Sequence, residues 1–381
     1  MQFIDLKAQY EVLKDEIDAN IQSVLDSGQY MMGDHVKQLE RELAEYVGTK
    51  HCITCANGTD ALQLALMVWN VKAGDAVFVP SFTFYSTAEV VSLLGATPIF
   101  VDTNPRTFNI DTVKLDQAIQ KVKQEGKLTP KVIIPVDLFG QPADYESIRR
   151  IANKHKLYVL EDGAQGFGGT IDGKKACSFG DISTTSFFPA KPLGCYGDGG
   201  ALFTDSDEYY GLLTSLRVHG KGTFKYDNVR VGMNSRLDTL QAGILLPKLK
   251  AFKDHEMEKR DLFAKQYTML LKEHVITPYV PEGMESSWAQ YTILLRSEEE
   301  RTFIQERLKK KQIPTMIYYP KPLHQQSVYQ DYDFNLDELK ECEHVANVCL
   351  SLPMHPYLDT ETVNYIANSL IECLKEHQNE K

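Results

Sequence analysis

Lys191 is the residue whose surroundings most clearly indicate chemistry. It follows the apolar run STTSFF, stands between Pro189 and Pro192, and precedes a glycine-rich stretch at residues 194–200. Two prolines and several glycines impose a tight backbone path. A partly desolvated lysine amine in such a loop can attack an aldehyde and form a Schiff base. The loop alone leaves two interpretations, a Schiff-base lysine and a solvated surface lysine.

Asp162 and Gln165 form a second candidate group. The apolar run LYVL leads into Glu161 and Asp162, and Gln165 follows three residues after Asp162. A pyridine ring that serves as an electron sink needs a carboxylate beside its nitrogen, which Asp162 could supply. Gln165 could then hydrogen-bond a ring hydroxyl. The simpler interpretation makes Asp162 the cap of the following turn.

A third candidate is the turn at Asn57, Gly58 and Thr59, between the apolar run HCITC and the helical pattern ALQLALMVW. Free N–H groups and the dipole at a helix N-terminus attract anions. Gly58 allows a close backbone approach and Thr59 adds a hydroxyl, so a phosphate could bind here. The same residues also fit a plain helix cap formed by Asn57 or Thr59.

Two further segments carry candidates. Phe84 lies in the run PSFTFYST, where an aromatic ring could stack on a flat cofactor or pack in the core. Asn234 and Arg236 lie in a loop before a predicted helix and suit an anionic group, although loops often expose polar residues.

The order of these groups along the chain favours one interpretation. An anion-binding turn, an aromatic residue, Asp162 with Gln165 after it, and Ser186 five residues before Lys191 are the groups that a pyridoxal phosphate (PLP) site requires. The sequence therefore predicts a PLP enzyme in which Lys191 and Asp162 are catalytic.

Alternating strands and helices are predicted to position these groups. The apolar runs HCITC, AVFVP, TPIFVD, KVIIPVDLF, LYVLED, STTSFF and ALFT are separated by helical patterns such as ADYESIRRIANKH. This alternation predicts an α/β fold with a mostly parallel sheet, whose site lies at the carboxyl ends of the strands. A large domain is expected over residues 1–245 and a smaller α+β domain over 246–381, with strands at QYTILL and PTMIYYP. A long charged helical region at 238–271, interrupted at Pro247, is expected to connect them.

The composition argues against several classes of protein. The 381 residues carry a formal net charge of -11, whereas nucleic-acid binders need a basic surface. No run of about 18 apolar residues and no secretory signal pattern occur, so a cytoplasmic protein without membrane segments is expected. The 7 irregularly spaced cysteines indicate reduced thiols. Cys52 and Cys55 should point to opposite faces of one strand, so no metal site is expected.

These motifs resemble those of the DegT/DnrJ/EryC1/StrS family of nucleotide-sugar aminotransferases. The resemblance covers essentially the whole chain, from FIDLK near its start through NGTDAL, EDGAQ and FFPAKPLG to SLPMHP at residues 351–356. It implies fold type I of the PLP-dependent transferases. It also implies glutamate as the amino donor and a homodimer with shared active sites.

The resemblance implies a role for each matching position. Lys191 would be the Schiff-base lysine and proton shuttle, Asp162 would pair with the pyridine nitrogen, and Gln165 would contact the ring hydroxyl. Phe84 would stack on the ring. The implied phosphate ligands are Gly58, Thr59, Ser186 and, from the other subunit, Asn234. The implied substrate contacts are Arg236, Tyr318 and Tyr319, although relatives often have His where this chain has Tyr318.

The segments FFPAKPLG and NSRLDTLQ are similar to those of relatives that act at C3 of the sugar. The implied reaction moves an amino group from glutamate to C3 of a 3-keto nucleotide sugar for surface polysaccharide synthesis, and UDP-2-acetamido-2-deoxy-3-oxo-glucuronate is the expected acceptor. A dTDP-3-keto-6-deoxyhexose, a 4-keto nucleotide sugar and a catalytically silent PLP-fold regulator remain alternatives. A sugar dehydratase of the family would carry His in place of Lys191. A nicotinamide dehydrogenase would need a GxGxxG turn opening a first βαβ unit, a spacing that neither glycine cluster completes.

Overall fold

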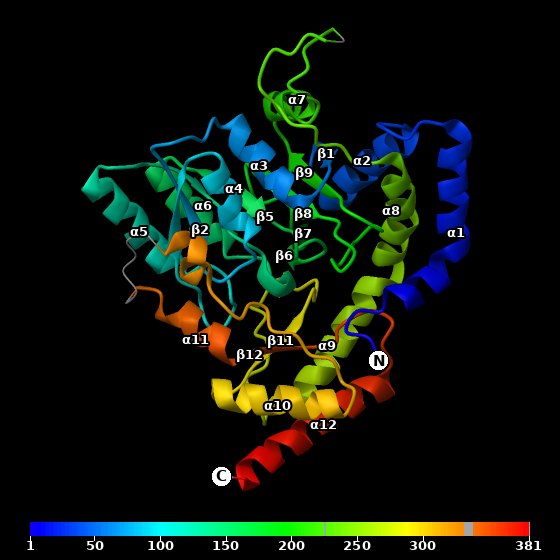
Figure 1. Ribbon diagram of the computed structural model, residues 1–381, viewed down its shortest axis with the longest axis vertical. Coiled ribbons are helices and arrows are strands. Elements are labelled where there is room, and N and C mark those ends of the chain that lie inside the picture. The colour runs from blue at the N-terminus through cyan, green and yellow to red at the C-terminus, as the bar shows by residue number, and fades with distance from the viewer. Residues whose placement is uncertain (225, 331–337, 381) are drawn as a thin grey trace.

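A seven-stranded sheet forms the centre of the computed structural model, which describes residues 1–224, 226–330 and 338–380 (Figure 1). In the order β1-β9-β8-β5-β4-β2-β3, its neighbours are parallel except that β9 runs antiparallel to β1 and β8. Each predicted apolar run forms one strand, and the predicted mostly parallel sheet is confirmed. The strands are β1 (His51–Cys55), β2 (Asp75–Pro80), β3 (Thr97–Val101), β4 (Thr129–Ile133), β5 (Tyr158–Asp162), β8 (Ile182–Ser186) and β9 (Gly200–Thr204).

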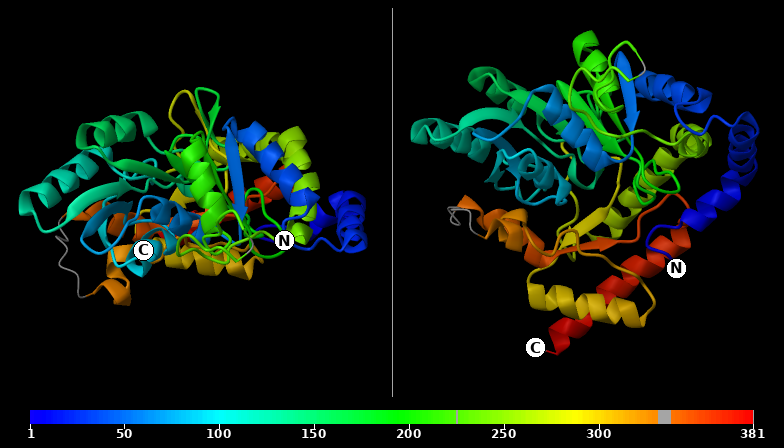
Figure 2. Two further views of the ribbon diagram at one scale, coloured as in Figure 1. Left: turned by 90° about the horizontal axis from the view of Figure 1, so that it is seen from above. Right: turned by 45° about the horizontal axis from the view of Figure 1, so that its top comes forward.

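Helices cover both faces of this sheet (Figure 2). Along β2, Val77 and Val79 enter the core on one face while Ala76 and Phe78 enter the core on the other, as the two-residue period of a strand requires. Helices α3 (Gly58–Val68), α4 (Ser86–Leu93) and α7 (Asp207–Leu216) pack on the first face. The second face is covered by α2 (Asp34–Val47), α5 (Thr112–Glu125), α6 (Tyr145–His155) and α8 (Thr239–Ala251).

Cys52 and Cys55 lie in the cores on opposite faces of the sheet, as predicted from their spacing. All seven cysteines are free and buried. No helix of the described residues is long and apolar enough to cross a membrane.

A second, smaller core lies beyond the edge of the large sheet, towards the bottom of Figure 1. Its sheet pairs β11 (Tyr291–Leu294) with β12 (Cys349–Leu352), and helices α9 (Met257–Leu271), α10 (Glu298–Lys310) and α12 (Thr360–Asn379) pack against it. The helix α8 spans the domain boundary predicted after residue 245, and that boundary stays a prediction. The remaining elements are α1 (Leu6–Ser27), α11 (Lys340–Val348), the short strands β6 (Thr170–Ile171), β7 (Lys174–Lys175) and β10 (Met284–Glu285), and 3-10 turns at Leu138–Gly140, Leu323–Gln325 and Ser327–Tyr329.

The predicted strand PTMIYYP is wrong. Only Met316 pairs there, in an isolated antiparallel bridge with Ser351 beside β12. Pro314 and Pro320 at its two ends have no N–H to donate to a neighbouring strand. This segment therefore runs as a loop beside β12 and carries Tyr318 and Tyr319.

The predicted interruption of the connecting helical region at Pro247 is also wrong. Helix α8 continues through Pro247 and is buried along most of its length, and the irregular π-helical turn (Phe252–Glu256) follows it. Pro247 cannot donate to the carbonyl of Gly243, four residues earlier. Asn20 of α1 replaces that donor, since its Nδ2 lies 2.9 Å from the Gly243 oxygen. A tertiary contact thus keeps this helix continuous.

Candidate active site

The carboxyl edge of the large sheet brings the predicted site residues together. Asp162 ends β5, Ser186 ends β8, and the loop that carries Lys191 follows β8 directly. Because β5 and β8 are parallel neighbours, their ends lie at the same edge. Asp162 and Lys191 are close enough there for each charge to act on the other.

Asp162 is a buried carboxylate with two donors. Its Oδ2 accepts a hydrogen bond from Thr87 Oγ1 at 2.9 Å, and its Oδ1 accepts one from the Ala164 N–H at 3.3 Å. Burial raises the pKa of Asp162, while the Thr87 hydroxyl and the charge of Lys191 oppose that rise. Such a carboxylate can share a proton with a basic ring nitrogen.

Lys191 is half-buried in a loop with little freedom. The Lys191 N–H donates to the Phe188 carbonyl at 2.9 Å, and a Cβ at Gly194 would lie 2.5 Å from the Pro189 carbonyl oxygen. Burial lowers the pKa of the Lys191 amine, and Asp162 opposes this effect. A lower pKa leaves more of the amine unprotonated and nucleophilic near neutral pH.

The turn before α3 lies against Ser186. Asn57 caps the helix, since its side chain accepts from the Asp60 N–H at 2.8 Å. A Cβ at Gly58 would lie only 2.7 Å from the Ser186 Cβ, so a side chain there would clash with Ser186. Thr59 Oγ1 lies 2.7 Å from Ser86 Oγ. Asn57 can therefore cap the helix while the same turn binds an anion. The helix N-terminus and the hydroxyls of Thr59, Ser86 and Ser186 lie together there.

Gln165, three residues after Asp162, is buried and contacts Tyr319. Its Oε1 accepts from the Phe139 N–H at 2.6 Å, and its Nε2 donates to the Tyr319 hydroxyl at 3.0 Å. Phe84 is 53% exposed, and its ring centroid lies 6.1 Å from that of Tyr319. About half of the Phe84 side chain is therefore exposed beside Tyr319.

The loop before α8 places Asn234 and Arg236 near the same turn. Ser235 Oγ accepts from the Ala56 N–H at 3.1 Å, which holds the loop next to Asn57. Asn234 is exposed, and its Oδ1 accepts from Arg236 Nη2 at 2.5 Å. Tyr318 instead points its ring towards Phe3, with centroids 6.2 Å apart.

Several contacts of this site were not found from the sequence. Thr87 holds Asp162 and lies in the quoted run PSFTFYST, so its place after a strand was the available signal. Phe139 acts through its backbone N–H, and Ser287 Oγ donates to the Gln165 carbonyl at 2.6 Å from a distant segment. Neither contact could be predicted from the sequence around Gln165.

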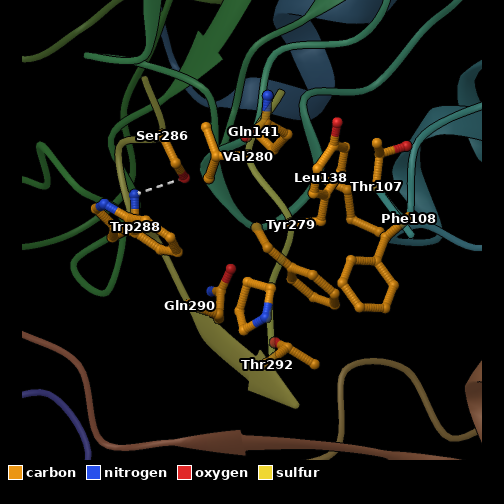
Figure 3. Close-up of a pocket in the computed structure, with 12 residues that line it drawn as sticks. Thr107, Phe108, Leu138, Gln141, Tyr279, Val280, Ser286, Trp288, Gln290 and Thr292 are labelled. Carbon is orange, nitrogen blue, oxygen red and sulfur yellow. Dashed lines mark hydrogen bonds between the residues drawn. The ribbon is translucent and has the colours of Figure 1, made fainter. Parts of the chain in front are cut away.

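A small cleft with a volume of about 20 Å³ lies beside Phe139, between the loops of the large sheet and residues 278–292 (Figure 3). Its walls are largely apolar and include Leu138, Tyr279 and Trp288. None of the predicted site residues, all of which lie within the described ranges, lines this cleft. The cleft is therefore separate from the group around Lys191.

The residues at the sheet edge fit pyridoxal phosphate. Asp162 matches the ring nitrogen, the half-buried Lys191 amine matches the aldehyde, and the helix N-terminus at Gly58 matches the phosphate. The absence of a side chain at Gly58 is needed for the close approach to Ser186. No three His, Cys, Asp or Glu side chains form a possible metal site within the described ranges.

Known proteins share this architecture over nearly their whole length. A Pseudomonas aeruginosa protein named UDP-2-acetamido-2-deoxy-3-oxo-D-glucuronate aminotransferase is 46% identical over 97% of this chain and 99% of its own. A Geobacillus stearothermophilus protein named pleiotropic regulatory protein is 42% identical over 97% of both chains. A Brucella abortus aminotransferase structure is 48% identical, covers 98% of this chain and 99% of its own, and superposes with a TM-score of 0.95.

The cofactor is seen directly in a similar structure. A Bacillus subtilis crystal structure with bound cofactor PMP is 31% identical, covers 98% of this chain and 85% of its own, and has a TM-score of 0.90. These likenesses confirm the predicted type I fold and the predicted pyridoxal phosphate cofactor. The model of the DegT/DnrJ/EryC1/StrS aminotransferase family matches residues 11–371. The chain therefore belongs to the DegT/DnrJ/EryC1/StrS aminotransferase family.

Proposed function

We propose that this protein transfers an amino group from glutamate to C3 of a 3-keto nucleotide sugar, with UDP-2-acetamido-2-deoxy-3-oxo-glucuronate as the acceptor. The observation that carries the proposal is the group formed by Lys191, Asp162 and Gln165 at the sheet edge. The similarity to the Pseudomonas aeruginosa aminotransferase over nearly the full length of both chains supports this acceptor.

Lys191 has two tasks in this reaction. Its amine would hold the aldehyde of pyridoxal phosphate in the resting enzyme. Once the amino group of glutamate has taken that place, the freed amine moves the proton from the α-carbon of the donor. Burial, which lowers the pKa of Lys191, favours both tasks because the amine must be unprotonated to accept a proton.

The remaining residues hold the ring and the phosphate. Bound pyridoxal phosphate supplies an aldehyde that condenses with amines and a protonated ring that accepts electrons from the reacting carbon. Asp162 would hold a proton at the ring nitrogen, Gln165 would donate to the ring oxygen, and Phe84 would cover a ring face. Gly58, Thr59 and Ser186 bind the phosphate through N–H and hydroxyl donors. Tyr319 and Arg236 are the proposed sugar-nucleotide contacts, with Tyr318 less directly placed.

Chemical labelling tests the role of Lys191. Borohydride reduction of the holoenzyme, followed by peptide mass mapping, should place the cofactor mass on Lys191. Lys191→Ala should abolish both the labelling and the glutamate half-reaction. Lys248→Met is the matched control, because Lys248 is another buried lysine whose pKa burial lowers, to about 8. Label on Lys248, or turnover by Lys191→Ala, would overturn the assignment.

A substrate screen tests the position of amination. The enzyme is first converted with glutamate and freed of 2-oxoglutarate, and then 3-keto and 4-keto nucleotide sugars with UDP or dTDP are added separately. We expect rapid amination of the 3-keto UDP-uronate, with the new amine at C3 by NMR. Faster amination of a 4-keto sugar would refute the proposed acceptor.

We also propose a homodimer in which Asn234 reaches the phosphate bound by the partner subunit. Asn234 is exposed in the single chain, which leaves it available for such a contact. Lys191→Ala and Asn234→Ala should each be inactive alone. Refolded together, they should regain about a quarter of wild-type activity, because each mixed dimer has one intact site. No recovery in verified mixed dimers would contradict a shared site.

A regulator without catalysis is not favoured, because relatives that are 46% and 39% identical to this chain are named aminotransferases, although a Geobacillus stearothermophilus relative is named pleiotropic regulatory protein. The pairing of Lys191 with Asp162 has no evident use in such a protein. Conversion of glutamate to 2-oxoglutarate by the purified protein would decide between them. The seven buried, unpaired cysteines support action in the reducing cytoplasm.

A further inference from the structure

Three distant segments converge on Gln165. The Phe139 N–H donates to its Oε1 at 2.6 Å, Ser287 Oγ donates to its backbone carbonyl at 2.6 Å, and its Nε2 donates to the Tyr319 hydroxyl at 3.0 Å. Gln165 is 3% exposed and Ser287 is 0% exposed. Both the backbone and the side chain of Gln165 are therefore held without help from solvent.

The Phe139 contact decides which end of the amide faces the cofactor. A backbone N–H can only donate, so the atom of Gln165 that lies 2.6 Å from it must be the oxygen. The NH2 group then lies on the side of Tyr319. One of its two hydrogens is used by Tyr319, and the other is left for a ring oxygen of the cofactor.

Ser287 is itself held tightly against the turn that contains Phe139. Its N–H donates to the Gly140 carbonyl at 2.9 Å, and the Gln290 N–H donates to the Phe139 carbonyl at 3.3 Å. Gly140 has φ +103°, and a Cβ there would lie 2.5 Å from Ser287 Oγ. The segment 286–290 therefore hydrogen-bonds both the turn that contains Phe139 and the backbone of Gln165.

We propose that Ser287 is a positioning residue for the cofactor: through Gln165 it directs a hydrogen-bond donor at the ring oxygen of bound pyridoxal phosphate. This inference rests on the proposed role of Gln165. Ser287 holds the Gln165 backbone while Phe139 fixes the amide, so together they determine where the Nε2 hydrogens point. A segment next to the small sheet would thus help to position the cofactor through Gln165.

Removing the Ser287 hydroxyl should change two properties of the bound cofactor. A donor aimed at the ring oxygen stabilises its ionised form. With a less ordered Gln165, pyridoxal phosphate should bind less tightly, by about three- to tenfold if one neutral hydrogen bond is lost. The pH midpoint of the visible absorbance of the holoenzyme should rise, because the ring oxygen would hold a proton more strongly.

Ser287→Ala is the test, with Ser286→Ala as its matched control. Ser286 is the buried neighbour, and its Oγ accepts from the Trp288 N–H at 3.1 Å. We expect Ser287→Ala to weaken cofactor binding and raise the midpoint, while Ser286→Ala changes affinity by less than about twofold and leaves the midpoint unmoved. Equal effects of the two variants on both measurements would overturn the inference. If Ser287→Ala does not fold, Ser287→Cys keeps a weaker donor and must give intermediate values; wild-type values would overturn the inference.

A double-mutant cycle with Gln165→Met tests whether Ser287 acts on the cofactor through the Gln165 side chain or by a general effect on the local structure. In that background the Ser287→Ala change should no longer alter cofactor affinity, because the amide is absent. An unchanged effect in the Gln165→Met background would show that Ser287 acts otherwise. Failure of the wild-type protein to bind pyridoxal phosphate would instead refute the proposed function.

Discussion

Replacing Glu161 by glutamine should destabilise the protein strongly, whereas replacing its buried neighbour Asp137 by asparagine should not. The Glu161 carboxylate accepts from the Phe179 N–H at 2.7 Å, the Gly180 N–H at 3.1 Å and Ser183 Oγ at 2.7 Å, and also from the Cys177 N–H. An amide in this place turns one acceptor into a donor that faces other donors. At least one buried N–H then loses its partner.

We expect the shared proton of this carboxyl pair on Asp137 rather than on Glu161. Burial and the charge of Glu161 raise the pKa of Asp137 well above its usual range. Burial raises the pKa of Glu161 as well, but its four donors stabilise its charge. Asparagine at 137 can still accept from the Ala143 N–H and the Tyr145 hydroxyl, as Asp137 Oδ1 does at 3.0 and 2.8 Å. Its NH2 group can donate to Glu161 in place of the carboxyl proton.

The expected magnitudes differ clearly. Glu161→Gln should lower the free energy of unfolding by about 3–5 kcal/mol, the usual cost of breaking a buried charged network. For a chain of this length, that corresponds to a melting temperature lower by roughly 4–6 °C. Asp137→Asn should stay within about 1 kcal/mol of wild type near pH 5.

The pH dependence has a definite sign. A carboxyl whose folded pKa is raised contributes stability that is present below its unfolded pKa, near 4, and is lost as the pH rises through its folded pKa. Wild type should therefore lose this stability above about pH 4, and Asp137→Asn should not. Thermal unfolding of the two variants and wild type from pH 5 to 8, in one cofactor state and at one scan rate, measures this. A larger loss for Asp137→Asn than for Glu161→Gln would refute the assignment of the proton.

Three further outcomes are expected. Asn20→Ala should lower the free energy of unfolding by about 1–2 kcal/mol, because the Gly243 carbonyl loses its donor. Adding Pro247→Ala should restore most of that stability, and a double variant as unstable as Asn20→Ala would contradict this role of Asn20. Thr87→Val should raise the pKa of Asp162 further, because the carboxylate loses a hydroxyl donor that Thr87→Ser keeps. On acidification, Thr87→Val should therefore lose cofactor binding at a higher pH than Thr87→Ser, and identical pH profiles would contradict this role of Thr87. Ellman's reagent should leave the native thiols unmodified and react with all seven after unfolding, and a fast thiol in the native protein would count against their burial.

The strands and the reactive residues could be predicted from the sequence because their causes are local. Each apolar run of the large sheet is bounded by turn residues, and both faces of the sheet are covered, so continuous apolar runs mark the strands. Lys191 lies between prolines and Asp162 lies directly after an apolar run. The strand wrongly predicted at PTMIYYP ignored a local signal, Pro314 and Pro320 at its two ends. The continuity of α8 could not be predicted in this way, because Asn20 supports it from far along the chain.

The sequence by itself determined which groups are present and in what order, since the chemistry of Lys191, Asp162 and Gln165 belongs to the side chains and the order of strands places them at one edge. Only the tertiary structure decided how those groups are tuned and oriented. The lowered pKa of Lys191 comes from burial, Thr87 holds Asp162, and the backbone N–H of Phe139 and the hydroxyl of Ser287 orient Gln165. Such contacts join segments far apart in the chain and depend on distances of a few tenths of an ångström. They follow from packing rather than from any local pattern of residues.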